Sequence, residues 1–155
     1  MNKNNYNQKY LAKGNILKRF LTFPFLYLAW FSPHKSMRTF FHRLRSVKIG
    51  RNVEIGYFCF IGHVHPQMII IEDNAVVTAR VTILEHDLSY YYTKRGNIKL
   101  GNVVIGNTAF IGIGSVIMPG IRVGAHAIIG ALTFINKNIP ANAIVAGNPA
   151  RLLKK

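Results

Sequence analysis

The chain has 155 residues, half of them apolar, which is enough for one domain with its own core and too little for a second full domain. Its 20 Lys and Arg residues outnumber 5 Asp and Glu residues, and the net charge of +15 predicts an anionic partner such as a phosphate-rich cofactor, an acidic lipid surface or a nucleic acid. The single cysteine, Cys59, excludes an intrachain disulfide framework and fits a reducing, cytoplasmic compartment.

Residues 1–46 form a basic and apolar N-terminal segment, which we expect to be helical. Its most apolar stretch, residues 20–31, is shorter than the roughly 20 residues of a membrane-spanning helix and contains Pro24. Two interpretations are compatible with this composition. The segment caps an open end of the core, or it lies in a membrane interface with Tyr27 and Trp30 at headgroup depth.

Residues 47–155 carry a six-residue repeat of Ile or Val, with a small or short β-branched residue four positions later. Six residues of α-helix turn by about 600°, so residues at this spacing would be spread around the helix and would form no apolar face. In a strand, an even spacing keeps the side chains on one face. The large positions are Ile49, Ile55, Ile61, Ile71, Val77, Ile83, Ile105, Ile111, Ile117, Val123, Ile129 and Ile135. The small ones are Val53, Cys59, Ala75, Val81, Ala109, Ser115, Ile121, Ala127, Thr133 and Ile139.

Three such hexads make one triangular coil, so the sequence predicts an all-β fold, a parallel β-helix of about four coils. Glycine often follows the large aliphatic residue directly, and we expect it to relieve the backbone at a corner between strands. These glycines are Gly50, Gly56, Gly62, Gly106, Gly112, Gly124 and Gly130.

The repeat loses its phase twice, between Ile61 and Ile71 and between Ile83 and Ile105. The first interval holds four extra residues and the second holds four more than a full coil, so loops are expected there. After Ile83, the corner and outward positions read Leu84, Glu85 and His86, and Asp87 would point inward. Because an unpaired carboxylate cannot lie in an aliphatic column, the chain must leave the solenoid near Asp87.

His86 is therefore a candidate general base at the root of a loop. Glu85 and Asp87 flank it, and a carboxylate beside an imidazole fixes its tautomer and raises its basicity. The alternative is a solvated histidine beside a capping acid. His63 and His65 lie on the first break, where they could bind a substrate, hold a metal as a pair, or be structural.

The remaining candidates are weaker. His34, His42 and His126 have the pattern of surface residues, and Cys59 falls on a small inward position, which predicts a core residue. The stretch SYYYTKRGNIK after His86 combines three tyrosines with three cations, which suits stacking on a sugar, with Tyr90 and Tyr91 as contacts, or a contact between subunits.

From Val47 to its end the chain resembles the hexapeptide-repeat acyltransferases, among them serine, maltose and galactoside acetyltransferases and those of bacterial exopolysaccharide synthesis. The segments ILEHDLSYYY and IGNTAFIGIGSVIMPGIRVGAHAIIGALTFINKNIPANAIVAGNPARLLK carry the resemblance. It implies a left-handed helix, a homotrimer with active sites between subunits, and acetyl-CoA as co-substrate with no metal.

The resemblance also implies a mechanism. His86 removes a proton from an acceptor hydroxyl, which attacks the thioester directly, and the backbone N–H of Ile113 steadies the oxyanion. Phe110 stands in the acceptor wall, where the family usually has tryptophan. Coenzyme A would lie against Gly112, Ile113, Gly130 and Ala131. Lys137, Arg151 and Lys154 match the family's cationic positions near the nucleotide phosphates, the alternative being a solvated basic tail.

The expected function is O-acetylation of a saccharide or of a polysaccharide or glycolipid precursor, in the cytoplasm or at the inner face of an anionic membrane. N-acetylation of an amino or nucleotide sugar is one alternative. A second is a non-catalytic basic scaffold for membrane or nucleic acid, but no nucleic-acid motif is present and the cations gather at the two ends. A carbonic anhydrase of the γ type would need two histidine ligands five residues apart, and no such pair occurs.

Overall fold

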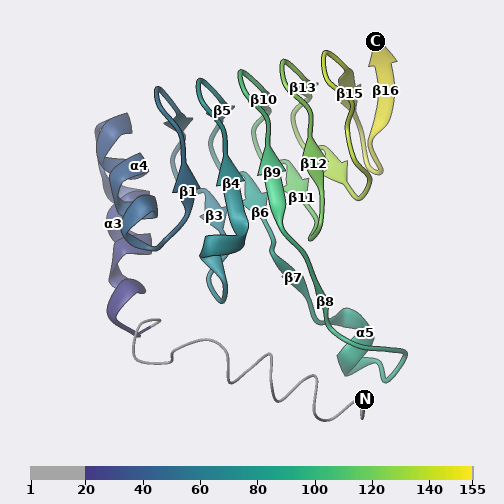
Figure 1. Ribbon diagram of the computed structural model, residues 1–155, viewed down its shortest axis with the longest axis horizontal. Helices are drawn as coiled ribbons and strands as arrows, with labels where there is room; N and C mark the ends of the chain where they lie inside the picture. The colour runs from purple at the N-terminus through teal and green to yellow at the C-terminus, as the bar shows by residue number, and fades with distance from the viewer. Residues whose placement is uncertain (1–19, 155) are drawn as a thin grey trace.

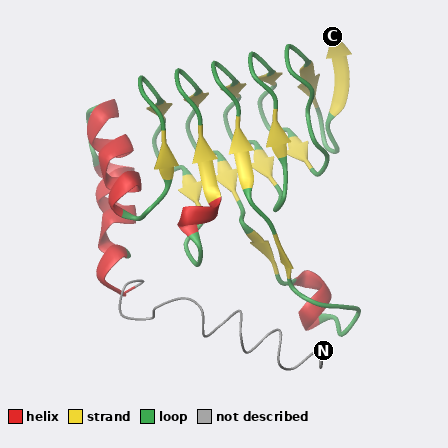
Figure 2. Ribbon diagram, viewed as in Figure 1, coloured by secondary structure: helices red, strands yellow, loops and turns green. Residues whose placement is uncertain are grey.

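The structure, a computed structural model, describes residues 20–154. Two helices, α3 (Pro24–Phe31) and α4 (Lys35–Leu44), precede a solenoid of short strands (Figures 1 and 2). Its strands are β1 (Lys48–Ile49), β2 (Glu54–Ile55), β3 (Phe60–Ile61), β4 (Ile69–Ile71), β5 (Val76–Val77), β6 (Thr82–Ile83), β9 (Val103–Ile105), β10 (Phe110–Ile111), β11 (Val116–Ile117), β12 (Arg122–Val123), β13 (Ile128–Ile129), β14 (Phe134–Ile135), β15 (Ile144–Ala146) and β16 (Arg151–Lys154).

The strands form three sheets, one on each side of the solenoid. The first is ordered β1-β4-β9-β12, the second β2-β5-β10-β13-β15-β16, and the third β3-β6-β11-β14. Each complete coil adds one parallel strand to each sheet, so four coils stack along the axis, as predicted (Figure 1). A fifth coil begins at Ile139, which forms a parallel bridge with Val123, and continues in β15. Strand β16 turns back antiparallel on β15 and covers the last edge of its sheet.

The core confirms both inward positions of the hexad. Of the twelve large aliphatic residues, only Ile49 is partly exposed, and all ten small positions are buried. Parallel pairing keeps equivalent residues in line, with Ile49 opposite Ile71 and Ile71 opposite Ile105. Cys59 lies in this column, and burial raises the pKa of its thiol to about 11, so it is a core residue, as expected.

The corner glycines have a different cause from the expected one. Six of the seven have a φ outside the left-handed region, Gly62 being the exception at +30°. A Cβ on Gly106 would lie 2.6 Å from the backbone nitrogen of Ala125, and one on Gly112 would lie 2.6 Å from that of Ala131. Glycine is therefore required because the backbone of the next coil approaches closely, not because the turn is left-handed.

Both breaks in the repeat open at the same corner, between the third and first sheets. Residues 62–68 form a short loop with a 3-10 turn, η1 (Pro66–Met68). Residues 84–102 form an arm in which β7 (His86–Asp87) pairs antiparallel with β8 (Lys99–Leu100), and α5 (Ser89–Tyr92) lies at the outer end of the arm, as Figure 1 shows. The chain thus leaves the solenoid near Asp87, as predicted. The residues between Ile83 and Ile105 form no extra coil, because β6 lies in the third sheet and β9 in the first, which is the next side of the solenoid.

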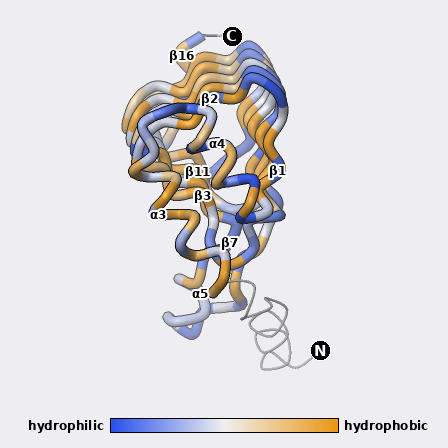
Figure 3. Tube along the Cα trace, turned by 90° about the vertical axis from the view of Figure 1, so that its left-hand side faces the viewer, coloured by the Kyte–Doolittle hydropathy of each residue, from blue (hydrophilic) through white to orange (hydrophobic). Residues whose placement is uncertain are grey.

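Helices α3 and α4 pack against each other and cover the first coil at one end of the solenoid (Figures 1 and 3). The indole nitrogen of Trp30 donates to the carbonyl of Cys59 at 2.7 Å, so Trp30 is tied to the solenoid, which disagrees with a place at headgroup depth. Tyr27 is half exposed. Residues 1–19 of the expected N-terminal segment lie outside the described residues, and no helix in residues 20–154 is long and apolar enough to cross a bilayer.

One surface expectation on this cap is wrong. His42 is buried, because α4 turns it toward the solenoid, where its Nδ1 lies 3.0 Å from Nη1 of Arg45. His34 and His126 are exposed, as expected, and Nδ1 of His34 accepts from the backbone N–H of Ser36 at the start of α4.

Candidate active site

The two loops at the shared corner bring three sequence candidates together. His63 and His65 come from the first break, and His86 comes from the root of the arm. The ring centroids of His63 and His86 are 5.7 Å apart, and the ring of Phe60 lies 5.5 Å from that of His63. His65 is buried, whereas His63 and His86 are partly exposed. The two breaks lie one coil apart, because they follow β3 and β6, which pair in parallel with Ile61 opposite Ile83.

Glu85 lies at the centre of this corner, and its position corrects the expectation of an outward side chain. It is completely buried. Its Oε1 accepts hydrogen bonds from the backbone N–H groups of Val64 and His65, each at 3.0 Å, and lies 3.1 Å from Nδ1 of His86. The first loop therefore folds around the carboxylate and supplies the partners that a buried charge requires.

The charge state of Glu85 determines which nitrogen of His86 carries a proton. Burial raises the pKa of Glu85, but hydrogen bonds from His86 and from the His65 backbone outweigh burial and hold this pKa at about 2. The carboxylate is thus ionised at neutral pH, and the imidazole nitrogen that faces it must carry a proton. In neutral His86, the lone pair is then on Nε2.

Asp87 has a different role from Glu85. Its Oδ1 accepts from the backbone N–H of Ser89 at 2.8 Å, at the start of α5. Partial burial raises the pKa of Asp87, while hydrogen bonds from Ser89 and the charge of Lys99 produce a net lowering. Its carboxylate is therefore engaged with the backbone of the arm, directly after the histidine.

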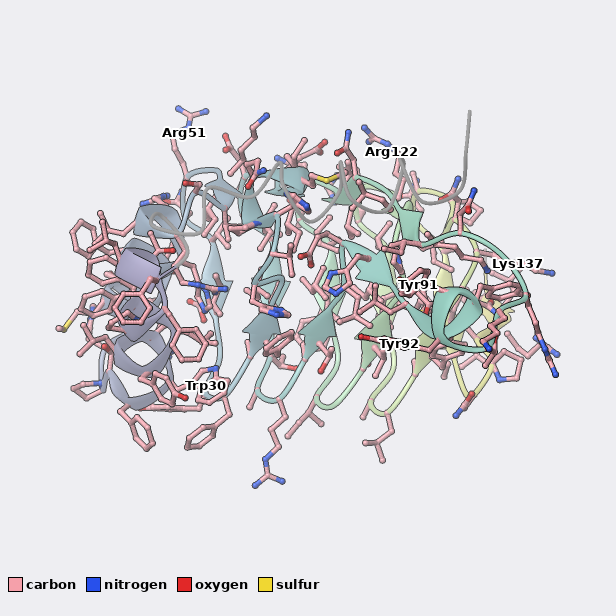
Figure 4. The ribbon with its side chains drawn as sticks, turned by 90° about the horizontal axis from the view of Figure 1, so that it is seen from below. Trp30, Arg51, Tyr91, Tyr92, Arg122 and Lys137 are labelled. Carbon is pink, nitrogen blue, oxygen red and sulfur yellow. The ribbon has the colours of Figure 1, made fainter. Side chains whose placement is uncertain are left out.

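The arm carries an exposed group of tyrosines close to His86 in the chain. Tyr90 and Tyr91 lie on α5, and Figure 4, which views the molecule from below, shows Tyr91 and Tyr92 on the arm in front of the solenoid. Nζ of Lys99 lies 4.4 Å from the ring centre of Tyr90, so a cation already covers one face of that ring. Tyr91 contacts Tyr92 edge-on at 5.5 Å between centroids.

The residues expected to hold coenzyme A gather at another corner, between the second and third sheets. Gly112 and Ile113 follow β10, and Gly130 and Ala131 occupy the same corner one coil further on. The side chain of Ile113 is 47% exposed, and its backbone N–H donates to no acceptor within residues 20–154. This corner thus presents an open amide beside a close stack of small residues.

A single chain does not bring the two groups together, since the third sheet separates the corner of His86 from the corner of Ile113. Phe110 lies half exposed on the outward side of β10. Lys137 follows β14 and points to solvent in Figure 4, while Arg151 and Lys154 are exposed on β16. Within residues 20–154, no three His, Cys, Asp or Glu side chains are arranged to hold a metal ion.

Comparison with known proteins gives a family match in the central coils. The model of the family described as bacterial transferase hexapeptide (six repeats) matches residues 102–137, which cover the third and fourth coils. The chain is 27% identical to the Bacillus subtilis (strain 168) protein YvoF over 139 residues, which is 89% of this chain and 76% of YvoF.

The chain is also similar to the galactoside O-acetyltransferase of Escherichia coli (strain K12), with 30% identity over 129 residues. This match covers 82% of the chain but only 61% of that enzyme, so the chain spans less than two thirds of it. Among solved structures, a galactoside acetyltransferase in complex with coenzyme A superposes with a TM-score of 0.68 and 24% identity over 92% of this chain and 82% of that one. The likeness confirms the left-handed parallel β-helix.

Proposed function

The chain belongs to the hexapeptide-repeat acyltransferases, and from this membership we propose that it transfers the acetyl group of acetyl-CoA to a hydroxyl group of a saccharide. The observation that carries the proposal is the pair formed by His86 and the buried, ionised Glu85. The sugar hydroxyl is supported by the similarity to a galactoside O-acetyltransferase and by the exposed Tyr90 and Tyr91 on the arm.

In the proposed reaction, His86 is the general base. Glu85 holds Nδ1–H, so Nε2 accepts the proton of the acceptor hydroxyl as its oxygen attacks the thioester carbon. The negative charge that develops on the carbonyl oxygen is stabilised by a backbone N–H, for which Ile113 has an open amide. Collapse of the tetrahedral intermediate breaks the C–S bond, and the imidazolium returns the proton to the thiolate of coenzyme A.

The separation of the two corners supports a site shared between copies of the chain. His86 and Ile113 lie on opposite edges of the third sheet, so an acceptor hydroxyl at one and a thioester at the other require a neighbouring subunit. A homotrimer meets this requirement. Coenzyme A would lie between subunits along Gly112 and Ala131, with its phosphates near exposed cations. These cations are Lys137, Arg151 and Lys154.

We further propose that the helical cap rests on an anionic membrane, where a lipid-linked saccharide would meet the active site. Large apolar side chains on α3 and just before it face solvent, among them Phe20 (80% exposed) and Phe31 (71% exposed), and α3 forms an apolar stretch in Figure 3. Eleven of the 20 Lys and Arg residues precede Glu54, the first acid of the chain. An apolar face within a segment without acids complements a negatively charged bilayer surface.

We expect the protein to co-sediment with vesicles rich in phosphatidylglycerol, less with phosphatidylcholine alone, and less as salt rises. Full burial of a Phe side chain is worth about 1.5–3 kcal/mol, so the double variant Phe20→Ser and Phe31→Ser should lower the affinity at least about tenfold. A double variant with Leu132→Ser and Leu153→Ser, two exposed residues outside the cap, is the control. Absence of co-sedimentation, or equal loss in the control, contradicts a membrane contact. A cap covered by a second copy would instead change the oligomeric state of the Phe variant.

The acetyltransferase proposal is tested by isothermal titration of acetyl-CoA into the protein and by following release of free thiol. We expect saturable binding, with thiol release accelerated by at least one member of a panel of neutral sugars, amino sugars and nucleotide-linked amino sugars. Mild alkali then separates the products, because it hydrolyses O-acetyl esters and leaves N-acetyl amides intact.

Each result bears on a named alternative. An alkali-stable product would replace the hydroxyl acceptor with an amine and leave the role of His86 in place. No binding of acetyl-CoA and no thiol release would contradict the enzymatic proposal and favour a basic scaffold. Salt-dependent binding to DNA would then distinguish nucleic acid from membrane as its partner.

A further inference from the structure

The buried carboxylate of Glu85 has a cationic neighbour that lies outside the repeat. Arg45, the residue after α4, is only 4% exposed. Its Nη1 lies 3.0 Å from Nδ1 of His42, and its Nη2 donates to the carbonyl oxygen of Gly62. Burial, and then the charge of Arg45, lower the pKa of His42 to about 3, so His42 is neutral and can accept this hydrogen bond.

Arg45 and Glu85 hold the same loop from two sides. Arg45 binds the carbonyl of Gly62, while Glu85 accepts from the N–H groups of Val64 and His65. Gly62 leaves room for this arrangement, because a Cβ there would lie 2.5 Å from Oε2 of Glu85. The carboxylate of Glu85 and the guanidinium of Arg45 therefore both lie against Gly62.

The two groups are also coupled electrostatically. Burial lowers the pKa of Arg45 and the charge of Glu85 raises it, with a net value of about 10, so Arg45 is a cation at neutral pH. A buried carboxylate is stabilised in its ionised form by a nearby cation as well as by hydrogen bonds. The helical cap thus provides positive charge beside the pair that contains His86.

We propose that Arg45 is a positioning residue for the proposed general base His86. It holds the loop of residues 62–65, whose backbone N–H groups bind the ionised carboxylate of Glu85, so Nδ1 of His86 keeps its proton and Nε2 keeps the lone pair that accepts one. This inference rests on the proposed function, in which His86 takes the proton of the acceptor.

Removal of the charge on Arg45 should change the pH dependence of the reaction. The titratable groups around Glu85 are His86, His65 and His63, with Arg45 and the neutral His42 on the side of the cap. Without the cation, a proton on the Glu85–His86 pair is less strongly repelled. The acid limb of the profile of kcat/KM against pH should therefore move to higher pH.

The test compares Arg45→Gln, which removes the charge, with Arg45→Lys, which keeps it. Arg38→Met is the matched control: Arg38 is also buried, lies on α4 and donates to carbonyls of Ile55 and Ser32 at 2.6 and 2.9 Å, but in the described part of the chain its hydrogen bonds do not reach the loop of residues 62–65. Two readouts are recorded for each variant, namely the pH profile of kcat/KM and the NMR titration of the His86 imidazole, assigned with His86→Asn.

We expect Arg45→Gln to lower kcat/KM at neutral pH by roughly 10- to 100-fold, the range typical for loss of a residue that orients a functional histidine. The titration midpoint of His86 should rise. Arg45→Lys should restore most of the pH profile. Arg38→Met should lower the thermal stability without moving either readout. If Arg45→Gln does not fold, Arg45→Lys is used in its place. Lysine keeps the charge but loses the guanidinium hydrogen bond to the carbonyl of Gly62, so kcat should fall while the acid limb of the pH profile changes little.

Coincidence of the pH profile and the His86 titration with those of the unsubstituted protein would overturn the proposal. So would an equal shift in Arg38→Met, which would mean that packing of the cap alone is responsible, or an unchanged kcat in Arg45→Lys. Failure of the proposed function looks different. The unsubstituted protein would then release no thiol, while the NMR titration would still report on the link between Arg45 and His86.

Discussion

Substitution of His86 by Asn is expected to slow acetyl transfer by about 10³-fold, because a positioned general base contributes roughly 10²–10⁴-fold. The KM for acetyl-CoA should stay within about twofold of its original value, since the proposed coenzyme A residues lie at the other corner of the coil. The measurement is the initial rate of thiol release at saturating acceptor and varied acetyl-CoA.

His126→Asn is the matched control for this substitution. His126 is exposed, lies at a third corner of the fourth coil and has a φ of +58°, a conformation that Asn also tolerates. We expect its kinetics to match those of the unsubstituted protein. A rate for His86→Asn within tenfold of the original would mean that His86 is not the base.

Glu85→Gln is expected to destabilise the protein at pH 7 by about 3 kcal/mol, because it removes a buried carboxylate whose pKa the hydrogen bonds from His86 and the His65 backbone hold at about 2. Denaturant unfolding followed by the fluorescence of Trp30, the one tryptophan, measures this difference where the cap meets the first coil. Glu54→Gln breaks the exposed ion pair with Lys35 and should cost less than about 1 kcal/mol.

The stability that Glu85 contributes should also depend on pH in a defined direction. Its pKa is about 2 in the folded chain against the ordinary value of 4.5, so the contribution is complete above pH 4.5 and is lost as the pH falls toward 2. The difference between the original chain and Glu85→Gln should therefore shrink over that window. A constant difference from pH 7 to pH 2 would show that Glu85 is not held ionised by the fold.

The architecture was largely predictable because every hexad places the same types of residue at the same positions. Ile or Val at every sixth position forms one apolar column only if the chain is extended, and the short side chains four residues later fit close to a turn. The number of coils and the identity of the buried residues therefore follow from the spacing alone. The role of the corner glycines was not predictable from local rules. Gly106 and Gly112 are constrained by the backbone of Ala125 and Ala131, which belong to the next coil.

The candidate site was predictable only in part. The repeat breaks located His86, since Asp87 could not enter the core, and they marked the loop of His63 and His65. Nothing in the spacing indicated that Glu85 would be buried, because its partners come from the backbone of residues 64 and 65. Arg45 and His42 were missed as well, since Arg45 was one of many basic residues in the N-terminal segment and His42 has the pattern of a surface residue.

The sequence by itself determined the hexad register, the inward residues and the places where the chain leaves the solenoid, because these depend on periodicity and on the cost of a charge in an aliphatic column. Tertiary structure decided which charges are buried and which groups meet. In the folded chain, the first loop binds Glu85 through the backbone N–H of Val64, and Arg45 donates to the carbonyl of Gly62. The third sheet lies between His86 and Ile113. These contacts join segments far apart in the chain, and only packing can select such partners.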